Sequence, residues 1–439
     1  MAHSVAIIGA GPSGLAIARA LDKAGIDYVG FESAAGVGGL WNIDNPRSSM
    51  YESAHLISSR TTTEFRELPM QSTADYPSHR ELRRYFQAFS DRFDLGDKFR
   101  FTTTVERLEP TEDDGWLLTS SADKQEPQTQ RFDSVILANG TLANPSVPTF
   151  DGNFAGEIIH SSEYKKATAF AGKRVLIVGA GNSGCDIAVD AVHHADSVDL
   201  SVRRGYYFVP RYVLGKPADT LNQGRPLPRR LKQFIDSRVL KAFTGDPVNF
   251  GFPRPDYRIY ESHPIVNTQV LGHIGQGDLR VMPTPERFDG HTVHFTDGTN
   301  ADYDMIVLAT GYTLDYPFVD REHLNWTGHA PELFLNIFPP SFNGLYVMGM
   351  IEASGIGWQG RYEQAELLAA YLGAQDDAPR AAAHFRESVE QPWPDLTGGY
   401  RYLALERMSY YVNKDAYRRA VRRAREALTR KARAIKDRP

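Results

Sequence analysis

The stretch from Val5 to Glu32 constrains the fold more than any other part of this sequence. It opens with a short apolar, β-branched run, Val5–Ile8, which is typical of a buried strand. Glycines at GxGxxG spacing follow, and then a helical segment from Ser13 to Ala24 and a second strand, Tyr28–Phe31. In such a pattern the first glycine allows a tight turn, the second admits a pyrophosphate, and the third lets helix and strand pack closely. The stretch therefore predicts a βαβ unit that binds a dinucleotide.

The chemistry of this unit depends on its three glycines, Gly9, Gly11 and Gly14, and on the acid Glu32. The predicted helix begins beside the glycines, so its amides and the positive end of its dipole face a bound phosphate. Glu32 ends the second predicted strand, where a carboxylate accepts hydrogen bonds from a ribose diol. A GxGxxG pattern alone is weak evidence, but strand, glycines, helix, strand and acid in this order are specific.

The same pattern returns 170 residues later, from Gly9 to Gly179. Here the strand is Val175–Val178, the glycines are Gly179, Gly181 and Gly184, and the ribose-side strand carries Ser201, Arg203 and Arg204 in place of an acid. An acid repels a 2′-phosphate, whereas a guanidinium forms paired hydrogen bonds with it. We therefore expect the first unit to bind FAD and the second to bind NADPH.

The repeat predicts an α/β fold with two Rossmann-like dinucleotide-binding domains, each built in three layers, and the NADPH domain inserted into the FAD domain. We expect the FAD domain to comprise residues 1–150 and 305–439, and the NADPH domain residues 165–304. Residues 151–164 form the expected linker, and residues 206–266 an irregular, proline- and arginine-rich insertion. The apolar strand from Tyr303 to Gly311 is expected to return the chain to the first domain.

Bulk properties exclude several classes of protein. The chain has 439 residues and a net charge of −5, which does not favour a nucleic-acid partner. It contains no run of 18 apolar residues, so we expect no membrane span, and the first strand starts too early for a signal peptide. The single cysteine, Cys185, fits a cytoplasmic protein and is expected to be a packed, inert thiol. We expect the basic C-terminal segment, 417–439, to form a docked helix with a solvated outer face.

A protein that holds both FAD and NADPH transfers hydride between them, and the open question is where the electrons go next. A dithiol acceptor requires a CxxC pair, which is absent, and no cluster has metal-ligand spacing. The remaining acceptors are a quinone, a protein partner or dioxygen. The segment from Phe154 to Tyr164 bears on this choice, because it carries Phe154, Gly156, His160 and Tyr164 as FxGxxxHxxxY.

By spacing alone this segment is only a connector with a histidine. The pattern nevertheless resembles the identifying motif of the flavin-containing monooxygenases, which are class B flavoprotein monooxygenases. GAGPSG, GGLW, GAGNSG, RRG and ATGY follow the order of that family, so the resemblance covers nearly the whole chain. Baeyer–Villiger relatives close the motif with Trp and Pro or Asp, whereas this chain has Tyr164 and Lys165, which favours the branch that oxygenates heteroatoms.

The resemblance implies that NADPH reduces FAD, that reduced FAD forms a C4a-hydroperoxyflavin with O2, and that an amine or sulfide takes the distal oxygen. No acid, base or nucleophile of the protein is then required. The residues carried over from the family are FAD contacts at Ser13, Glu32, Gly39, Leu40, Trp41 and Val105, NADPH contacts at Asn182, Ser183, Arg203 and Arg204, and a domain-crossing strand end at Thr310 and Gly311.

One departure concerns the stretch from Leu56 to Phe65, where many family members place an Asn near the flavin. This chain has Ser58, Ser59 and Arg60 there, which we expect to form a wall beside the flavin. Two alternatives stay open: a Baeyer–Villiger or oxidative-decarboxylating monooxygenase acting on ketones or keto acids, and a flavin electron carrier or redox sensor. The expected partners are a small nucleophilic substrate and O2, and a homodimer stays open.

Overall fold

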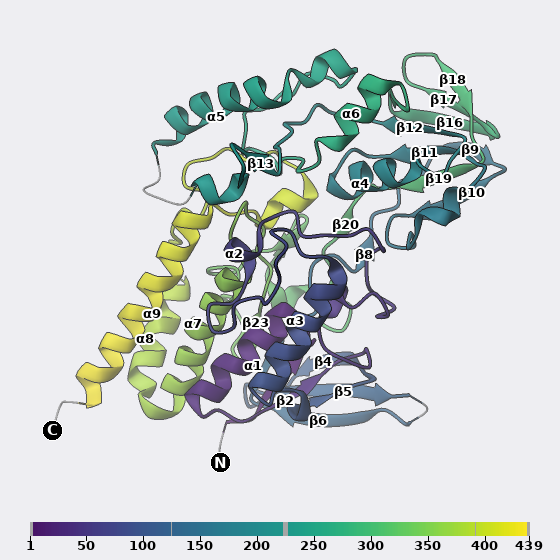
Figure 1. The fold of residues 1–439 in the computed structure, drawn as a ribbon. Helices are drawn as coiled ribbons and strands as arrows, with labels where there is room; N and C mark the ends of the chain where they lie inside the picture. The colour runs from purple at the N-terminus through teal and green to yellow at the C-terminus, as the bar shows by residue number, and fades with distance from the viewer. Residues whose placement is uncertain (1–2, 124, 223–226, 391, 437–439) are drawn as a thin grey trace.

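Two parallel sheets organise the molecule (Figure 1). The structure is a computed structural model, and it describes residues 3–123, 125–222, 227–390 and 392–436. The first sheet contains, in spatial order, β23 (Leu345–Val347), β7 (Ser134–Leu137), β1 (Val5–Ile8), β2 (Tyr28–Phe31) and β3 (Phe99–Arg100). The second contains β10 (Glu157–His160), β19 (Met305–Leu308), β11 (Arg174–Val178), β12 (Ser197–Ser201) and β15 (Leu279–Met282). We call the regions built around them the first and the second lobe.

Each parallel sheet is the middle of three layers. A smaller sheet covers one face. In the first lobe it is antiparallel and contains β4 (Thr103–Pro110), β5 (Trp116–Ala122) and β6 (Gln128–Phe132). In the second lobe it contains β9 (Asp151–Phe154), β16 (Pro285–Gly290), β17 (Thr292–Phe295) and β18 (Asn300–Asp302), of which β9 and β16 pair in parallel and the others antiparallel. Helices cover the other face: α1 (Pro12–Ala24), α3 (His79–Arg92) and α7 (Gly357–Asp377) in the first lobe, and α4 (Asn182–Ala191) and α6 (Gln269–Gln276) in the second.

The alternation of side chains along the central strands explains these layers. In β1, Val5 and Ile7 join the core beneath the helices, whereas Ala6 and Ile8 join the core beneath the antiparallel sheet. In the second lobe β11 divides its side chains between two cores in the same way. All of these strand residues are buried, as expected for parallel strands covered on both faces. The prediction of two three-layered α/β units is confirmed.

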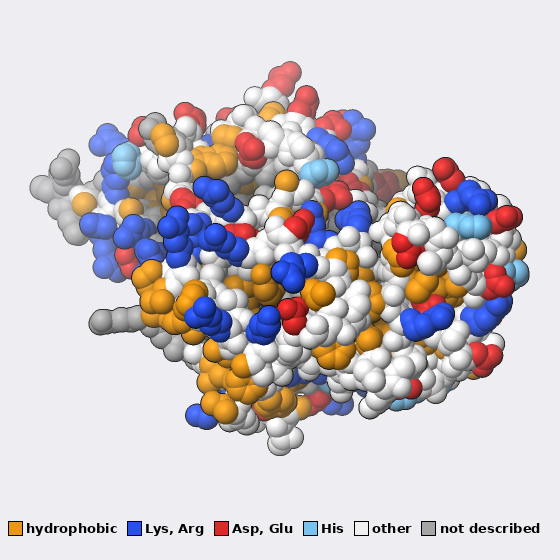
Figure 2. Space-filling view, turned by 90° about the horizontal axis from the view of Figure 1, so that it is seen from above, with side chains coloured by type: hydrophobic (Ala, Val, Ile, Leu, Met, Phe, Trp, Pro, Cys, Tyr) orange, Lys and Arg blue, Asp and Glu red, His pale blue; other side chains and the backbone are white. Residues whose placement is uncertain are grey.

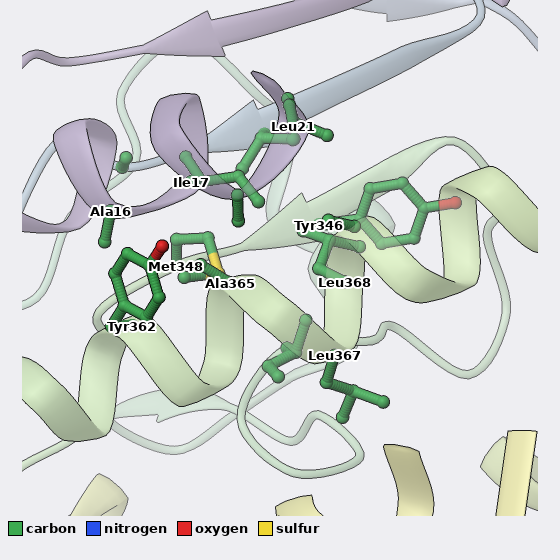
Figure 3. Packing of buried hydrophobic residues seen from close by; sticks show 14 of the residues in the cluster. Ala16, Ile17, Leu21, Tyr346, Met348, Tyr362, Ala365, Leu367 and Leu368 are labelled. Carbon is green, nitrogen blue, oxygen red and sulfur yellow. The ribbon is translucent and has the colours of Figure 1, made fainter. Parts of the chain in front are cut away.

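The core of the first lobe lies mainly between α1 and α7. Figure 3 shows α1 lying beside α7, with Met348 between the two helices; Ile17 and Leu21 of α1 belong to one core cluster with Ala365 and Leu368 of α7. All five side chains are at most 2% exposed. Burying a side chain of the size of Leu contributes roughly 1.5–3 kcal/mol, so this contact fixes α1, and with it the glycine turn that precedes α1.

The chain crosses between the lobes at a short antiparallel ribbon of β8 (Asn144–Pro145) and β20 (Tyr312–Thr313). The predicted boundary at residue 305 is wrong, because β19 (Met305–Leu308) pairs with β10 and β11 inside the second sheet. The expected linker, residues 151–164, likewise contributes β9 and β10 to the sheets of the second lobe. β7 and β19 are both buried four-residue strands of similar composition. The sequence therefore does not indicate which of the two sheets each strand joins.

The insertion between residues 206 and 266 contains α5 (Arg229–Thr244), which runs along the top of the molecule in Figure 1. Its outer face exposes apolar side chains, with Leu231 46% and Phe234 52% exposed. The view from above shows hydrophobic side chains gathered beside Lys and Arg side chains on this face (Figure 2). The insertion is also joined to the first lobe, because the Tyr212 hydroxyl donates to Asp75 Oδ2 at 3.0 Å.

The basic C-terminal segment forms α9 (Lys414–Lys436), which packs against α7 and α8 (Pro379–Glu390). Tyr417, Val421 and Leu428 are buried in that contact, which confirms the expectation of a docked helix. The remaining elements are the short helix α2 (Arg60–Thr63) and the strands β13 (Tyr212–Val213), β14 (Lys216–Pro217), β21 (Trp326–Thr327) and β22 (Ala330–Pro331). Short 3-10 helices cover Gly39–Trp41, Gly96–Lys98, Ala167–Phe170, Ala218–Asn222, Pro247–Phe250, Arg321–Leu324 and Glu406–Tyr410.

Candidate functional site

The turn between β1 and α1 has a shape that only glycine permits at two positions. Gly9 has a φ of +104°, and a Cβ there would lie 2.6 Å from the carbonyl oxygen of Ala138. A Cβ on Gly14 would lie 1.9 Å from the carbonyl oxygen of Gly9. Neither contact is physically possible, so both glycines are required for the approach of β1, α1 and the strand end at Ala138.

A pocket opens beside this turn, at the carboxyl ends of β1, β2 and β7, where ligands bind in α/β folds. Its lining includes seven of the residues predicted to contact FAD, among them the first two glycines of the motif and the third residue of β4. These residues are Gly9, Gly11, Ser13, Glu32, Gly39, Leu40 and Val105. The backbone amides at the N-terminus of α1 lie at the same place, which suits a pyrophosphate.

Glu32 is held at the edge of this pocket by backbone hydrogen bonds. Its side chain is buried, Oε2 accepts the N–H of Ala10 at 2.7 Å, and Oε1 accepts the N–H of Ala34 at 2.8 Å. The Ser33 hydroxyl donates to Oε1 as well, at 3.4 Å. A carboxylate has about four acceptor positions, so these three bonds leave capacity for a ribose hydroxyl. The residues in the pocket fit a dinucleotide whose ribose carries a free diol.

The second turn, between β11 and α4, repeats this geometry closely. Gly179 has a φ of +108°, and its Cβ would lie 2.5 Å from the carbonyl oxygen of Ala309. A Cβ on Gly184 would lie 1.9 Å from the carbonyl oxygen of Gly179. At Gly181 a Cβ would meet no atom of the described residues within 4 Å, so space lies open in front of the N-terminus of α4. The second turn therefore also fits a pyrophosphate.

The ribose side of the second turn differs in detail from the prediction. Arg203 is exposed directly after β12, and Arg204 Nε lies 3.3 Å from Asp256 Oδ1. Ser201 is buried, and its hydroxyl donates to the carbonyl oxygen of Pro283 at 2.7 Å, so it does not face the open space with the arginines. The predicted serine contact stays a prediction, which would require the hydroxyl to leave Pro283, because residue 201 points into the interior at the end of a buried strand.

Asn182, another predicted NADPH contact, is engaged by the chain itself. Its Oδ1 accepts the N–H of Val266 at 2.7 Å, and its Nδ2 donates to the carbonyl oxygen of Pro264 at 3.3 Å. The side chain thus fastens the end of the insertion to the start of α4. Ser183, the next residue, is half-buried in the first turn of α4.

The FxGxxxHxxxY motif braces the crossing between the lobes. His160 Nε2 donates to the carbonyl oxygen of Gly311 at 3.0 Å, which leaves Nδ1 to accept the N–H of Ser162 at 3.1 Å. Burial lowers the pKa of His160, so the neutral tautomer with the proton on Nε2 is favoured. A Cβ on Gly156 would lie 2.4 Å from the carbonyl oxygen of Asp304, so a larger residue does not fit there.

The two aromatic members of the motif pack inside the second lobe. Phe154 contacts Phe288, with ring centroids 5.7 Å apart, and Tyr164 stacks on Phe170 at 5.0 Å. The Tyr164 hydroxyl donates to Asp190 Oδ2 at 2.8 Å, at the end of α4. None of the four motif residues, Phe154, Gly156, His160 and Tyr164, lines the pocket beside β1. Their contacts instead position the crossing between the lobes and α4.

Three further predicted contacts lie outside the pocket beside β1. Trp41 packs edge-on against Trp358 at 6.0 Å, within the aromatic cluster beneath α3 and α7. The Thr310 hydroxyl donates to the carbonyl oxygen of Ser146 at 2.6 Å, and Gly311 is the acceptor for His160. Thr310 and Gly311 therefore hold the crossing, as a domain-crossing strand end does.

One of the three residues expected to form a flavin-side wall contacts the insertion. The N–H and hydroxyl of Ser59 donate to Asp219 Oδ2 at 2.7 and 3.0 Å, and Ser58 Oγ lies 2.8 Å from Thr63 Oγ1. Arg60 Nη1 donates to the carbonyl oxygen of Met70 at 3.4 Å. The pocket beside β1 does not include these three residues. Ser59 instead links the first lobe to the insertion at α2, whereas Ser58 and Arg60 bond within the first lobe.

Sequence reasoning missed several residues that line the same pocket: Asn45, Arg47, Thr103, Thr104, Asn139 and Thr141. Asn139 and Thr141 follow β7 directly, and the end of a strand beside the glycine turn was the available signal. Asn45 and Arg47 lie in a loop without a periodic sequence pattern, so its position beside the pocket could not be predicted. Arg47 adds a cation to the pocket that the glycine motif alone does not predict.

Other chemistry is limited. Cys185 is fully buried and its Sγ donates weakly to the carbonyl oxygen of Ala180 at 3.7 Å, which confirms the expectation of a packed thiol. Burial also raises the pKa of this thiol. In the part of the chain that the structure describes, no group of three or more His, Cys, Asp or Glu residues is arranged to hold a metal ion. Among the described helices, none is long and apolar enough to cross a membrane.

The geometry defines a class of protein in which one chain carries two dinucleotide turns, each with a three-layered lobe of its own. Comparison with known proteins narrows this class. Residues 2–383 match the family model described as flavin-binding monooxygenase-like. The chain belongs to this family of oxidoreductases.

Similar curated proteins support the assignment. Flavin-containing monooxygenase 5 of Oryctolagus cuniculus is 30% identical over 375 residues, which cover 80% of this chain and 70% of that protein. Dimethylaniline monooxygenase [N-oxide-forming] 2 of Cavia porcellus is 31% identical over 380 residues, with 81% and 70% covered.

Solved structures share the fold. The open crystal structure of cyclohexanone monooxygenase has a TM-score of 0.72 at 20% identity and covers 99% of each chain. S-allyl-L-cysteine S-oxygenase from Allium sativum has a TM-score of 0.66 at 18% identity and covers 99% of this chain and 93% of its own.

Proposed function

We propose that this chain is an NADPH- and FAD-dependent monooxygenase that transfers one oxygen atom from O2 to a soft nucleophile, the nitrogen of an amine or the sulfur of a sulfide. The observation that carries the proposal is the pair of glycine turns of equal geometry with opposite charge at their ribose ends: Glu32 after β2, and Arg203 and Arg204 after β12.

In this proposal the first lobe binds FAD. Gly9, Gly11 and Ser13 receive the pyrophosphate, and Glu32 accepts the ribose hydroxyls, because its carboxylate is already fixed by two backbone amides. Gly39, Leu40 and Val105 form the remaining walls of the pocket. Bound FAD supplies the oxygen-activating chemistry, and the protein binds it, orients it and excludes water.

The second lobe binds NADPH at Gly179, Gly181, Ser183 and the amides that open α4. Arg203 provides the main contact to the 2′-phosphate, because it is exposed and follows the ribose-side strand. Arg204 contributes less, since it is paired with Asp256. The two lobes meet through Ser59 and Asp219, and this contact holds the insertion over α2.

Two observations favour nitrogen or sulfur as the oxygen acceptor. One similar protein is named for N-oxide formation and another, of the same fold, for S-oxygenation. In addition, Tyr164 and Lys165 end the FxGxxxHxxxY motif where Baeyer–Villiger relatives carry Trp and Pro or Asp. The Lys165 ammonium donates to the carbonyl oxygens of Ser48 and Met50, so it has a defined place in this chain.

The second candidate is a Baeyer–Villiger or oxidative-decarboxylating reaction on a ketone or keto acid. The observation that favours it is the similarity of fold to cyclohexanone monooxygenase over 99% of both chains. At 20% identity this likeness concerns the fold and leaves the substrate open.

A panel experiment tests the proposal. Purified protein supplied with FAD and NADPH is given N,N-dimethylaniline, thioanisole, cyclohexanone or phenylpyruvate, and O2 uptake and oxygenated products are measured. An N-oxide or a sulfoxide containing one atom of labelled O2 is the expected result. A lactone or a decarboxylated acid as the main product favours the second candidate. NADPH oxidation that yields only peroxide with every substrate, or transfers electrons only to an added carrier, contradicts both.

A further inference from the structure

The segment from Pro253 to Asp256 packs directly against the ribose end of the second turn. Gly205 follows the two arginines, and a Cβ there would lie 2.2 Å from the carbonyl oxygen of Pro253 and 2.4 Å from the nitrogen of Pro255. The backbones are thus in contact, and prolines on either side of Arg254 restrict the segment further. Asp256 therefore has a fixed place beside Arg204.

The carboxylate of Asp256 forms an ion pair with Arg204 but not with Arg203. Its Oδ1 is 3.3 Å from Arg204 Nε, and the side chains of Arg204 and Asp256 are 35% and 59% exposed. Arg203 is exposed and forms no ion pair with another described residue. One of the two guanidinium groups is therefore already neutralised at the place where a 2′-phosphate would be received.

We propose that Asp256 limits the preference of this chain for NADPH over NADH, an inference that rests on the proposed coenzyme site. The carboxylate competes with a 2′-phosphate for Arg204 and adds a negative charge beside it, whereas a 2′-hydroxyl carries no charge for the carboxylate to repel. Because the pair is partly exposed, the effect is that of one screened charge, roughly 3- to 10-fold in affinity. Asp256 is in this sense a specificity-determining residue, although it lies outside the glycine motif.

The test uses the full chain and two fragments of the coenzymes, 2′,5′-ADP and 5′-AMP, which differ by the 2′-phosphate. Dissociation constants are measured by calorimetry, without catalysis. For Asp256→Asn we expect 2′,5′-ADP to bind roughly 3- to 10-fold more tightly and 5′-AMP to bind as before. Asp256→Glu keeps the charge and is expected to keep the wild-type ratio. Raising the salt concentration should shrink the gain of Asp256→Asn.

Asp113→Asn is the matched control, because Asp113 also pairs with an arginine on the surface, Arg131 at 2.7 Å, but in the antiparallel sheet of the first lobe. It should change neither affinity. Weaker binding of 2′,5′-ADP in Asp256→Asn, equal changes for both fragments, or no change would overturn the inference. Equal affinity of the wild-type chain for the two fragments would instead overturn the assignment of the coenzyme site itself.

Discussion

The two glycine turns allow one prediction that separates the functions of the lobes. In Gly184→Ala the new methyl would start 1.9 Å from the carbonyl oxygen of Gly179 and 3.1 Å from the Cβ of Ala309. The turn and the helix must then move apart by about 1 Å, and overpacking of this kind costs roughly 1–3 kcal/mol. Gly14→Ala creates the same 1.9 Å contact, with Gly9, in the first lobe.

In the proposed function this turn receives the pyrophosphate, and because the methyl displaces the turn, we expect most of this cost to appear as weaker binding. For Gly184→Ala, 1–3 kcal/mol corresponds to roughly a 5- to 150-fold rise in the Michaelis constant for NADPH, while the protein keeps its FAD. Gly14→Ala should be purified with little FAD and should bind 2′,5′-ADP normally. Flavin absorbance, calorimetry and stopped-flow reduction by NADPH measure the three quantities.

Gly272→Ala serves as the control, since Gly272 is an exposed helical residue of α6 whose Cβ would meet no described atom within 4 Å. Alanine is favoured over glycine in a helix by roughly 0.5–1 kcal/mol, so this variant should be slightly more stable and otherwise unchanged. The reasoning is refuted if Gly184→Ala binds NADPH as the wild type does, or if Gly14→Ala retains FAD and Gly184→Ala loses it.

Three further predictions concern charge, pH and the C-terminal helix. Arg203→Ala should raise the Michaelis constant for NADPH roughly 10- to 150-fold, since a hydrogen bond to a charged group contributes roughly 1.5–3 kcal/mol, and leave that for NADH nearly unchanged; equal losses for both coenzymes in steady-state kinetics contradict it. Burial opposes ionisation of Asp133, but hydrogen bonds from Ser4 and Arg131 outweigh it and lower its pKa to about 2. This carboxylate therefore stabilises the fold above its unfolded pKa of 3.8, and the stability is lost as the pH falls toward 2, so the difference in Tm between wild type and Asp133→Asn should shrink over that window. Tyr417→Phe should cost roughly 1–3 kcal/mol in denaturant unfolding, because the buried Tyr417 hydroxyl donates to the carbonyl oxygen of Leu335 at 2.7 Å; an unchanged midpoint contradicts a docked α9.

Much of the fold was predictable because the glycine motifs fix strand, turn and helix together over about 30 residues. The buried strands and the docked C-terminal helix follow from the pattern of apolar residues within single segments. The repeat follows from comparing the two glycine motifs. The sheet to which β19 belongs could not be predicted in this way. The composition of an apolar strand buried on both faces does not indicate which strands it pairs with. Only long-range pairing decides that Met305–Leu308 lies beside β10 and β11.

Some residues of the candidate site could be predicted from the sequence and others could not. The places of Gly9, Glu32 and Arg203 in the fold were predictable because their positions within the βαβ unit are fixed, and their contacts to the coenzymes stay predictions. Ser201 was not, since one residue of register at the end of β12 decides whether a side chain faces the interior or the coenzyme. The partner of Arg204 was also hidden: Asp256 is 52 residues away, in a segment without periodicity.

The order of the strands in the first sheet has a consequence for synthesis of the chain. β1, β2, β3 and β7 leave the ribosome early, but β23 and α7, which close the core against α1, follow only after the whole second lobe. The second sheet is complete once β19 has been synthesised, because β19 pairs with β10 in its interior. The first sheet is still incomplete at that point. Its strand β7 has no partner on one side until β23 is synthesised. An exposed apolar edge invites association with other chains. Substitutions that slow closure of the second lobe are therefore expected to reduce the yield of folded protein during expression, even when the finished molecule is stable.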